Sequence, residues 1–477
     1  MDVDDEFYVV TRDDEKSLSY ATGNRERVLR IAAKWNKGEG AEKEADEEEE
    51  AAEETFSHHS ALSETLKSAV NFCRSQFQVL VILSTLGEGL NQAFIKRNIF
   101  EKLESDHISI EEIDGCKIYR VSEETAEEIS RSDERSSILE LSGEKIAPSI
   151  FMGMIASFDA LIVDVVGKLI RLDPTRYSSA DKAIPVEQIL SASSIDELVQ
   201  SFIADELYRF SRESHEVQTA YIEKHFSIKI REKWKRWPDF IEVFERRNLV
   251  AHGERKFNNR YVSICSKAGH KGSEKVANQE VKIELPYQIQ ALNILSEYAI
   301  LLCFSLWRKH ASDKESQAFE TLNEAAFTLI QDRHYVLAER ILEFALTLKG
   351  TEVSEEIRKM MVVNLASACR SSHGEDKCRE ILENEDWSAS AIHFQLSVAA
   401  LKGDEARLVE LIPKAKLLGF EMFSYRTWPV FRFVRDNDAI NAALEAAYGE
   451  RLSKPPKLIA EGDPESSAED VPEGTMH

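Results

Sequence analysis

Long apolar stretches with helical spacing, separated by few glycines and prolines, limit what this chain can fold into. One of them runs from Ile150 to Leu172 and stops at Asp173-Pro174, where proline prevents a regular helix from continuing. The 477 residues contain only 11 prolines and 19 glycines, which favours helices over a sandwich of many short strands. We therefore predict an all-α fold.

The same stretch contains Asp159 and Asp164, which indicates a buried helix and not a membrane span. No uninterrupted apolar stretch approaches the roughly 20 residues that cross a bilayer, and the N-terminus is acidic where a signal peptide would be basic. We expect a cytoplasmic protein without membrane contact. The six cysteines form no CxxC pair and have no nearby histidine at metal-ligand spacing, so we expect reduced structural thiols, no metal site and no cofactor.

Composition and periodicity divide the chain into five expected segments. The first is largely disordered, because Glu39 to Glu54 carries ten carboxylates against one lysine. The second is a small α-rich N-terminal region with a short strand near Lys117 to Val121. The third is a helical domain, the fourth a set of helical repeats, and the fifth a disordered tail rich in Pro, Glu and Ser. Their ranges are 1–60, 61–145, 146–310, 316–451 and 452–477.

Local signals predict where the helices of the third segment begin and end. One helix begins after Ser194 and another begins near His215. The next runs from about Pro238 and stops at Gly253, a natural C-terminal cap, and the last begins at Pro286. Between them, NNRYVSICSKAG (258–269) and EVKIELP (280–286) are predicted to be short extended pieces.

Residues 316–451 are predicted to form helices that pair across short turns. SQAFETLNEAAFTLIQDRHYVLAERILEFALTL combines a helix, a tight polar turn and a second helix that carries the small Ala338 and Ala345 where helices must approach closely. This unit resembles one tetratricopeptide-like repeat. Two further pairs are expected between Ile357 and Gly419, and we expect this segment to bind a protein partner or an antitoxin.

The run RRNLVAHG, from Arg246 to Gly253, places an arginine, an amide and a histidine together. Arg247 and His252 are five residues apart, which puts them roughly 140° apart around a regular helix. Gly253 allows the helix to end at His252, and a second copy of the helix across a two-fold axis would bring each Arg to face the other copy's His. This arrangement predicts a homodimer.

These residue types suit RNA cleavage without a metal ion. His252 can act as base or acid, because an ordinary imidazole titrates near neutrality. Arg247 can hold a phosphate with two donors, and Asn248 can orient the phosphate or the imidazole.

The residues around the motif are locally basic in a chain of net charge -25. From Lys224 to Arg260 the sequence has eleven Lys and Arg against five acidic residues. Trp234 and Trp237 either stack on bases or belong to the core. The candidate RNA-binding residues are Arg246, Lys235, Arg236, Arg255, Lys256 and Arg260.

With Arg247, Asn248 and His252 at the matching positions, the segment 146–310 resembles the bacterial HEPN domains. The resemblance implies a helical bundle that dimerises with its motifs facing each other. It also implies metal-independent RNA cleavage that leaves a 2′,3′-cyclic phosphate, commonly in toxin, abortive-infection or antiphage systems. An acidic residue on the first helix sometimes assists in that family, and Asp159 or Asp164 could match it.

Two other functions are compatible with the sequence. The bundle could be a non-catalytic dimerisation scaffold, in which Arg247 and His252 only stabilise a helix end and the repeats bind a protein partner. A nucleotide-binding regulator has less support, because no glycine-rich phosphate loop is present and the glycines of GEGLNQAF (87–94) lack the required spacing.

Overall fold

The computed structural model describes residues 8–12, 17–21, 58–89, 109–113, 116–119, 123–173, 189, 192–311, 315–348 and 353–452. Most of the acidic segment 1–60, residues 114–115 and the tail after Leu452 lie outside these residues. The described residues are predominantly helical, which confirms the expected predominance of helix. The contacts divide the chain into two units, Met1–Ala61 and Leu62–His477.

Two short antiparallel hairpins accompany the helices. In one, β1 (Tyr8–Arg12) pairs with β2 (Ser17–Ala21), inside the segment that was expected to be largely disordered. In the other, β3 (Ser109–Ile113) pairs with β4 (Cys116–Tyr119), which overlaps the strand expected near Lys117.

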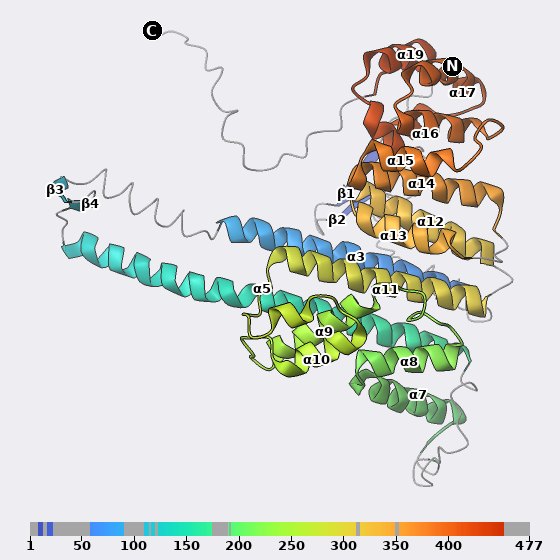
Figure 1. The fold of residues 1–477 in the computed structure, drawn as a ribbon. Coiled ribbons are helices and arrows are strands. Elements are labelled where there is room, and N and C mark those ends of the chain that lie inside the picture. The colour runs from blue at the N-terminus through green and yellow to red at the C-terminus, as the bar shows by residue number, and fades with distance from the viewer. Residues whose placement is uncertain are drawn as a thin grey trace. The chain divides into compact units, whose positions relative to one another are not determined.

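One hydrophobic core includes helices between residues 58 and 311 and continues into the following helices as far as Cys369. Leu62 and Leu66 of the first helix are fully buried in it, and the Cys303 thiol in the last helix before residue 311 donates a hydrogen bond to the Thr65 carbonyl. The second helix runs unbroken across residue 145, where two segments were expected to meet. The helices are α3 (His58–Gly89), α5 (Glu123–Leu172), α7 (Ile195–Arg212), α8 (His215–Phe226), α9 (Trp237–Ala251), α10 (Asn259–Ala268) and α11 (Leu285–His310), with the 3-10 turn η2 (Ser273–Val276) (Figure 1).

The segment 258–269 is a helix, so the prediction of an extended piece there was wrong. Asn258 caps α10 by accepting a hydrogen bond from the Tyr261 backbone N–H at 2.9 Å. Tyr261 and Cys265, four residues apart, are buried on one face against Leu249 and Phe257. Aromatic and β-branched residues favour strands locally, but here the cap and the burial of one helical face decide the structure.

The residues after 314 form a succession of helices. Each helix from α12 to α17 packs against the next, and α14 packs against both α12 and α16 (Figure 1). A second core, which extends from Val362 to Leu452, lies inside this part. The elements are α12 (Glu315–Gln331), α13 (Tyr335–Leu346), α14 (Glu355–His373), α15 (Glu375–Glu383), α16 (Ile392–Lys402), α17 (Glu405–Leu417), α18 (Met422–Thr427), η4 (Pro429–Val434) and α19 (Asp438–Tyr448).

Two helical segments, Lys145–Leu172 and Leu285–His310, are long and apolar enough to cross a bilayer by length and composition alone. In the second, 78% of the most apolar window is buried inside the protein, as in the core helix of a globular fold; in the first the share is 44%. The cytoplasmic location stays a prediction.

Candidate functional site

The RRNLVAHG motif lies at the C-terminal end of α9. Pro238 occupies the first turn of this helix, where its missing N–H costs nothing, and Phe240 and Phe244 are buried in the core. The helix stops because Gly253 adopts a left-handed conformation with φ of +69°. The backbone N–H of His252 donates to the Asn248 carbonyl at 3.1 Å, so His252 is the capping residue.

His252 is exposed at this helix end. Within the part of the chain that the structure describes, its imidazole makes no hydrogen bond or ion pair, so both ring nitrogens are available to a ligand.

Arg247 is half-buried one turn after Phe244. Its Nε atom is buried, and no hydrogen-bond partner for it exists among the described residues. An unsatisfied buried donor of this kind costs free energy unless a ligand or an ordered water supplies an acceptor.

A histidine that was not singled out in the sequence lies beside Arg247. The His215 ring stacks on Phe244, with the ring centroids 3.3 Å apart, and Arg247 acts electrostatically on it. His215 Nε2 donates to Asp159 Oδ1 at 2.7 Å, and since a carboxylate can only accept, Nε2 carries the proton. Burial lowers the pKa of His215, against the opposing effects of Asp159.

The two aspartates of α5 therefore differ in their surroundings. Asp159 pairs with His215 and so lies on the side of α5 that faces α8 and the motif helix. Asp164 pairs with Lys168 at 3.2 Å on the same helix. Of the two acidic candidates, only Asp159 contacts a neighbour of Arg247.

Asn248 lies over Glu245, one turn earlier. Its Nδ2 donates to Glu245 Oε1 at 3.2 Å. Burial raises the pKa of the Glu245 carboxyl, while Arg260, Asn248 and Arg247 act in the opposite direction. The amide and two arginines of the motif region therefore gather around one half-buried carboxyl.

Arg246 belongs to an internal network and not to the exposed surface. Its Nε donates to Glu242 Oε1 at 2.7 Å, and its guanidinium lies over the Tyr287 ring, 3.7 Å from the centroid. Glu242 also accepts hydrogen bonds from the Tyr261 hydroxyl at 2.6 Å and the Tyr287 hydroxyl at 2.9 Å. Because these contacts occupy its guanidinium, we leave Arg246 out of the RNA-binding set proposed below.

The remaining basic candidates separate into two places. Arg255, Lys256 and Arg260 are exposed, just after the motif. Lys235 and Arg236 precede the first turn of α9, and the sixteen residue-to-residue steps from Arg236 to His252 span about 24 Å at the rise of a helix. The structure does not bring these two groups together.

The two tryptophans also differ. Trp234 is only 4% exposed, and its Nε1 donates to Glu297 Oε1 at 2.6 Å, so it belongs to the core and cannot stack on a base. Trp237 is half-buried.

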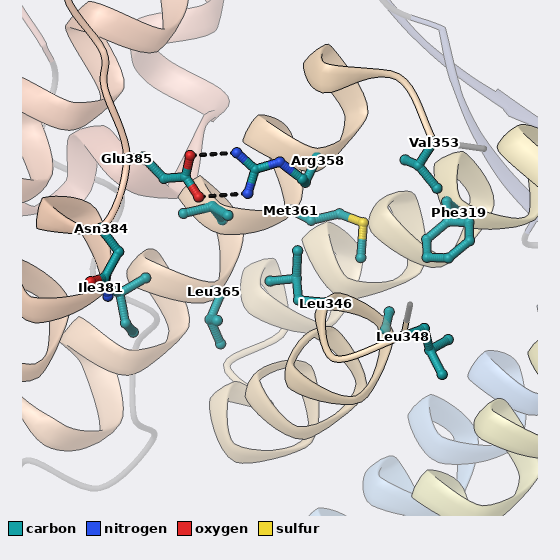
Figure 2. Close-up of a pocket in the computed structure, with 12 residues that line it drawn as sticks. Phe319, Leu346, Leu348, Val353, Arg358, Met361, Leu365, Ile381, Asn384 and Glu385 are labelled. Atoms are coloured by element: carbon teal, nitrogen blue, oxygen red, sulfur yellow. Dashed lines mark hydrogen bonds and ion pairs between the residues drawn. The ribbon is translucent and has the colours of Figure 1, made fainter. Parts of the chain in front are cut away.

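Two cavities that share the wall residues Leu346 and Leu365 lie beside the first helices after residue 314. The smaller, about 420 Å³, is lined by apolar residues that include Phe319, Met361 and Leu365, with Arg358 and Glu385 at its side. Figure 2 shows both terminal nitrogens of Arg358 aimed at the two carboxylate oxygens of Glu385, so this cation is already neutralised inside the protein. The larger, about 650 Å³, lies between the loop before α9 and helices α11, α13 and α14.

No group of three or more His, Cys, Asp or Glu in the described ranges is placed to hold a metal ion. Comparisons with protein-family models, with curated proteins and with solved structures find no match to this chain.

Proposed function

We propose that the protein is a metal-independent RNA endonuclease of the HEPN type. The observation that carries the proposal is the end of α9, where Asn248 lies between an exposed His252 and an Arg247 Nε that both lack a partner among the described residues. The half-buried Arg247 guanidinium suits a phosphate, and the exposed imidazole suits proton transfer.

In this reaction the 2′-oxygen of a ribose attacks the adjacent phosphorus and the 5′-oxygen leaves. A base takes the 2′-hydroxyl proton and an acid supplies a proton to the 5′-oxygen, so the products are a 2′,3′-cyclic phosphate and a free 5′-hydroxyl. His252 is assigned one of the two proton transfers, and Arg247 stabilises the charge on the phosphorane oxygens.

Asp159 and His215 are assigned a positioning role. His215, whose ring stacks on Phe244, interacts electrostatically with Arg247. A neutral His215, held by Asp159, does not repel the arginine, and this favours one fixed orientation of the guanidinium.

A second copy of the chain completes the proposed site. Arg247 and His252 lie about 140° apart around α9 by their spacing. One copy therefore does not direct both side chains to one phosphate, whereas two copies across a two-fold axis can supply two histidines for the two proton transfers. The exposed Arg255, Lys256 and Arg260 beside the motif would hold the RNA backbone.

The helices after residue 314 support an accessory role for that part of the chain. Packing of each helix on the next, with the first helices of neighbouring pairs in contact, is typical of tetratricopeptide-like arrays. We propose that this array binds the protein that triggers or inhibits a toxin or antiphage effector in the cytoplasm.

The test compares purified wild type with His252→Ala and Arg247→Ala on total RNA in the presence of EDTA. The control is His373→Ala, which removes a histidine whose side chain is 51% exposed in α14, far along the chain from the motif. Circular dichroism and light scattering establish that every variant is folded and has the wild-type oligomeric state.

We expect wild type and His373→Ala to produce 2′,3′-cyclic ends and the two motif variants to leave RNA intact. The proposal fails if wild type cleaves no RNA in vitro and expression of wild type and His252→Ala has the same effect on cell growth and RNA. That result would favour the dimerisation scaffold, which needs no chemistry at His252.

A further inference from the structure

The cavity of about 650 Å³ has the size of a small-molecule site. Four separate segments line it: the loop before α9, α11, α13 with the residue that follows it, and α14. The residues are Lys233, Trp234, Lys235, Arg236, Glu297, Leu301, Arg340, Glu343, Phe344, Leu346, Thr347 and Leu365.

Positive charge exceeds negative charge on this lining. The Glu297 carboxylate forms ion pairs with Arg340 at 3.3 Å and with Arg236 at 3.6 Å, and these neutralise its charge. It also accepts a hydrogen bond from Trp234 Nε1. The side-chain ammonium groups of Lys233 and Lys235 make no hydrogen bond or ion pair with any residue that the structure describes.

Glu343, the second carboxyl of the lining, acts electrostatically on Lys235, but it forms no ion pair with either lysine among the described residues. Burial, and then the neighbouring Glu339, raise the pKa of Glu343, while Lys377, Arg340 and Lys235 lower it. Two ammonium groups therefore remain for an anion at the loop before α9.

Apolar side chains form a second part of the same lining. Leu301, Phe344, Leu346 and Leu365 provide aliphatic and aromatic side chains to the same cavity. A ligand that fits both surfaces has an anionic group at one end and a flat apolar group at the other.

The neighbouring cavity provides a comparison within the same protein. Both cavities use Leu346 and Leu365 as wall residues. In the smaller cavity the Arg358 guanidinium is paired with Glu385 (Figure 2), so no cation there is free for a ligand. Of these two cavities, only the larger has cationic side chains without an ion-pair partner among the described residues.

We propose that the larger cavity binds a mononucleotide. Its phosphate is held by Lys233 and Lys235, its base packs on the Phe344 side, and Glu343 accepts hydrogen bonds from the ribose or from an amino group of the base. No glycine-rich loop marks this site in the sequence, because its residues come from four segments that only the fold brings together. The site is separate from the end of α9 that carries His252.

Isothermal titration of the full-length protein tests the proposal with AMP, GMP, CMP and UMP, each against inorganic phosphate and the matching nucleoside. We expect at least one mononucleotide to bind about tenfold more tightly than either of its parts, because the two surfaces then act together. A Lys233→Ala/Lys235→Ala variant should weaken that binding by about tenfold or more.

Lys229→Ala is the matched control, because Lys229 lies on the same loop but pairs with Glu232 at 3.1 Å and does not line the cavity. It should bind like wild type. The proposal is overturned if none of the four mononucleotides binds, or if the double variant binds as tightly as wild type. Because binding and not RNA cleavage is measured, this outcome is independent of the fate of the proposed nuclease.

Discussion

Asp159 Oδ1 and His215 Nε2, fifty-six positions apart in the sequence, lie 2.7 Å from each other next to the helix that carries the candidate motif. This contact joins α5 to the first residue of α8. It fixes the His215 ring on Phe244, and it distinguishes Asp159 from Asp164, whose partner is a lysine on its own helix.

The first prediction concerns this pair. Asp159→Ala should lower the free energy of unfolding by about 1 kcal/mol, because it leaves the buried His215 N–H without an acceptor while partial exposure of the site lets water compensate in part. Asp164→Ala, which removes a carboxylate that is 50% exposed, should cost less than about 0.5 kcal/mol. Urea unfolding of both variants measures the two free energies. An equal decrease in both variants would contradict a structural role for the Asp159–His215 hydrogen bond.

The second prediction is a pH dependence. Burial holds the pKa of folded His215 below its ordinary value of 6.5, so the unfolded chain binds the proton first as the pH falls. The stability contributed by neutral His215 is therefore complete above about pH 6.5 and is lost below it, toward the folded pKa.

When the pH falls from about 7.5 to about 5.5, the free energy of unfolding should therefore decrease less for His215→Asn than for wild type. Urea unfolding at the two pH values measures both decreases. Burial also lowers the pKa of His334 and His393, but these are present in both proteins and cancel in the difference. Parallel losses in the two proteins would show that His215 does not titrate as described.

The third prediction separates Arg246 from Arg247. Arg246→Ala should lower the free energy of unfolding by about 3 kcal/mol, because it leaves the Glu242 carboxylate, on a side chain that is 5% exposed, without its cation. Arg255→Ala, at an exposed site, should change stability by no more than about 0.5 kcal/mol. Thermal and urea unfolding provide the comparison, and a stable Arg246→Ala protein would show that the network is not structural.

Much of the helical architecture follows from local signals in the sequence. Ser194 caps α7, Pro286 lies in the first turn of α11 and Gly253 ends α9, as the sequence predicted. Caps and prolines act through the backbone within one turn, so they can be recognised without knowledge of the fold.

Other features depend on contacts between distant segments. Pairing of Asp159 with His215 and the cavity that reaches from Lys233 to Leu365 require the tertiary structure. The sequence does not reveal that Trp234 and Arg246 are buried, because the same charged and aromatic residues would also be present on an exposed basic surface. The residues of α10 favour a strand locally, but they form a helix because the burial of one helical face contributes more to stability.

Helix α9 has a mechanical consequence. Its 15 residues form a rod of about 22 Å, and every turn is packed on the core through residues such as Phe240 and Phe244. Such a rod resists bending, so its cap residue Arg236, which lines the large cavity, and the motif at Arg247 to His252 keep a fixed separation. The cavity and the motif therefore lie at the two ends of one rigid element.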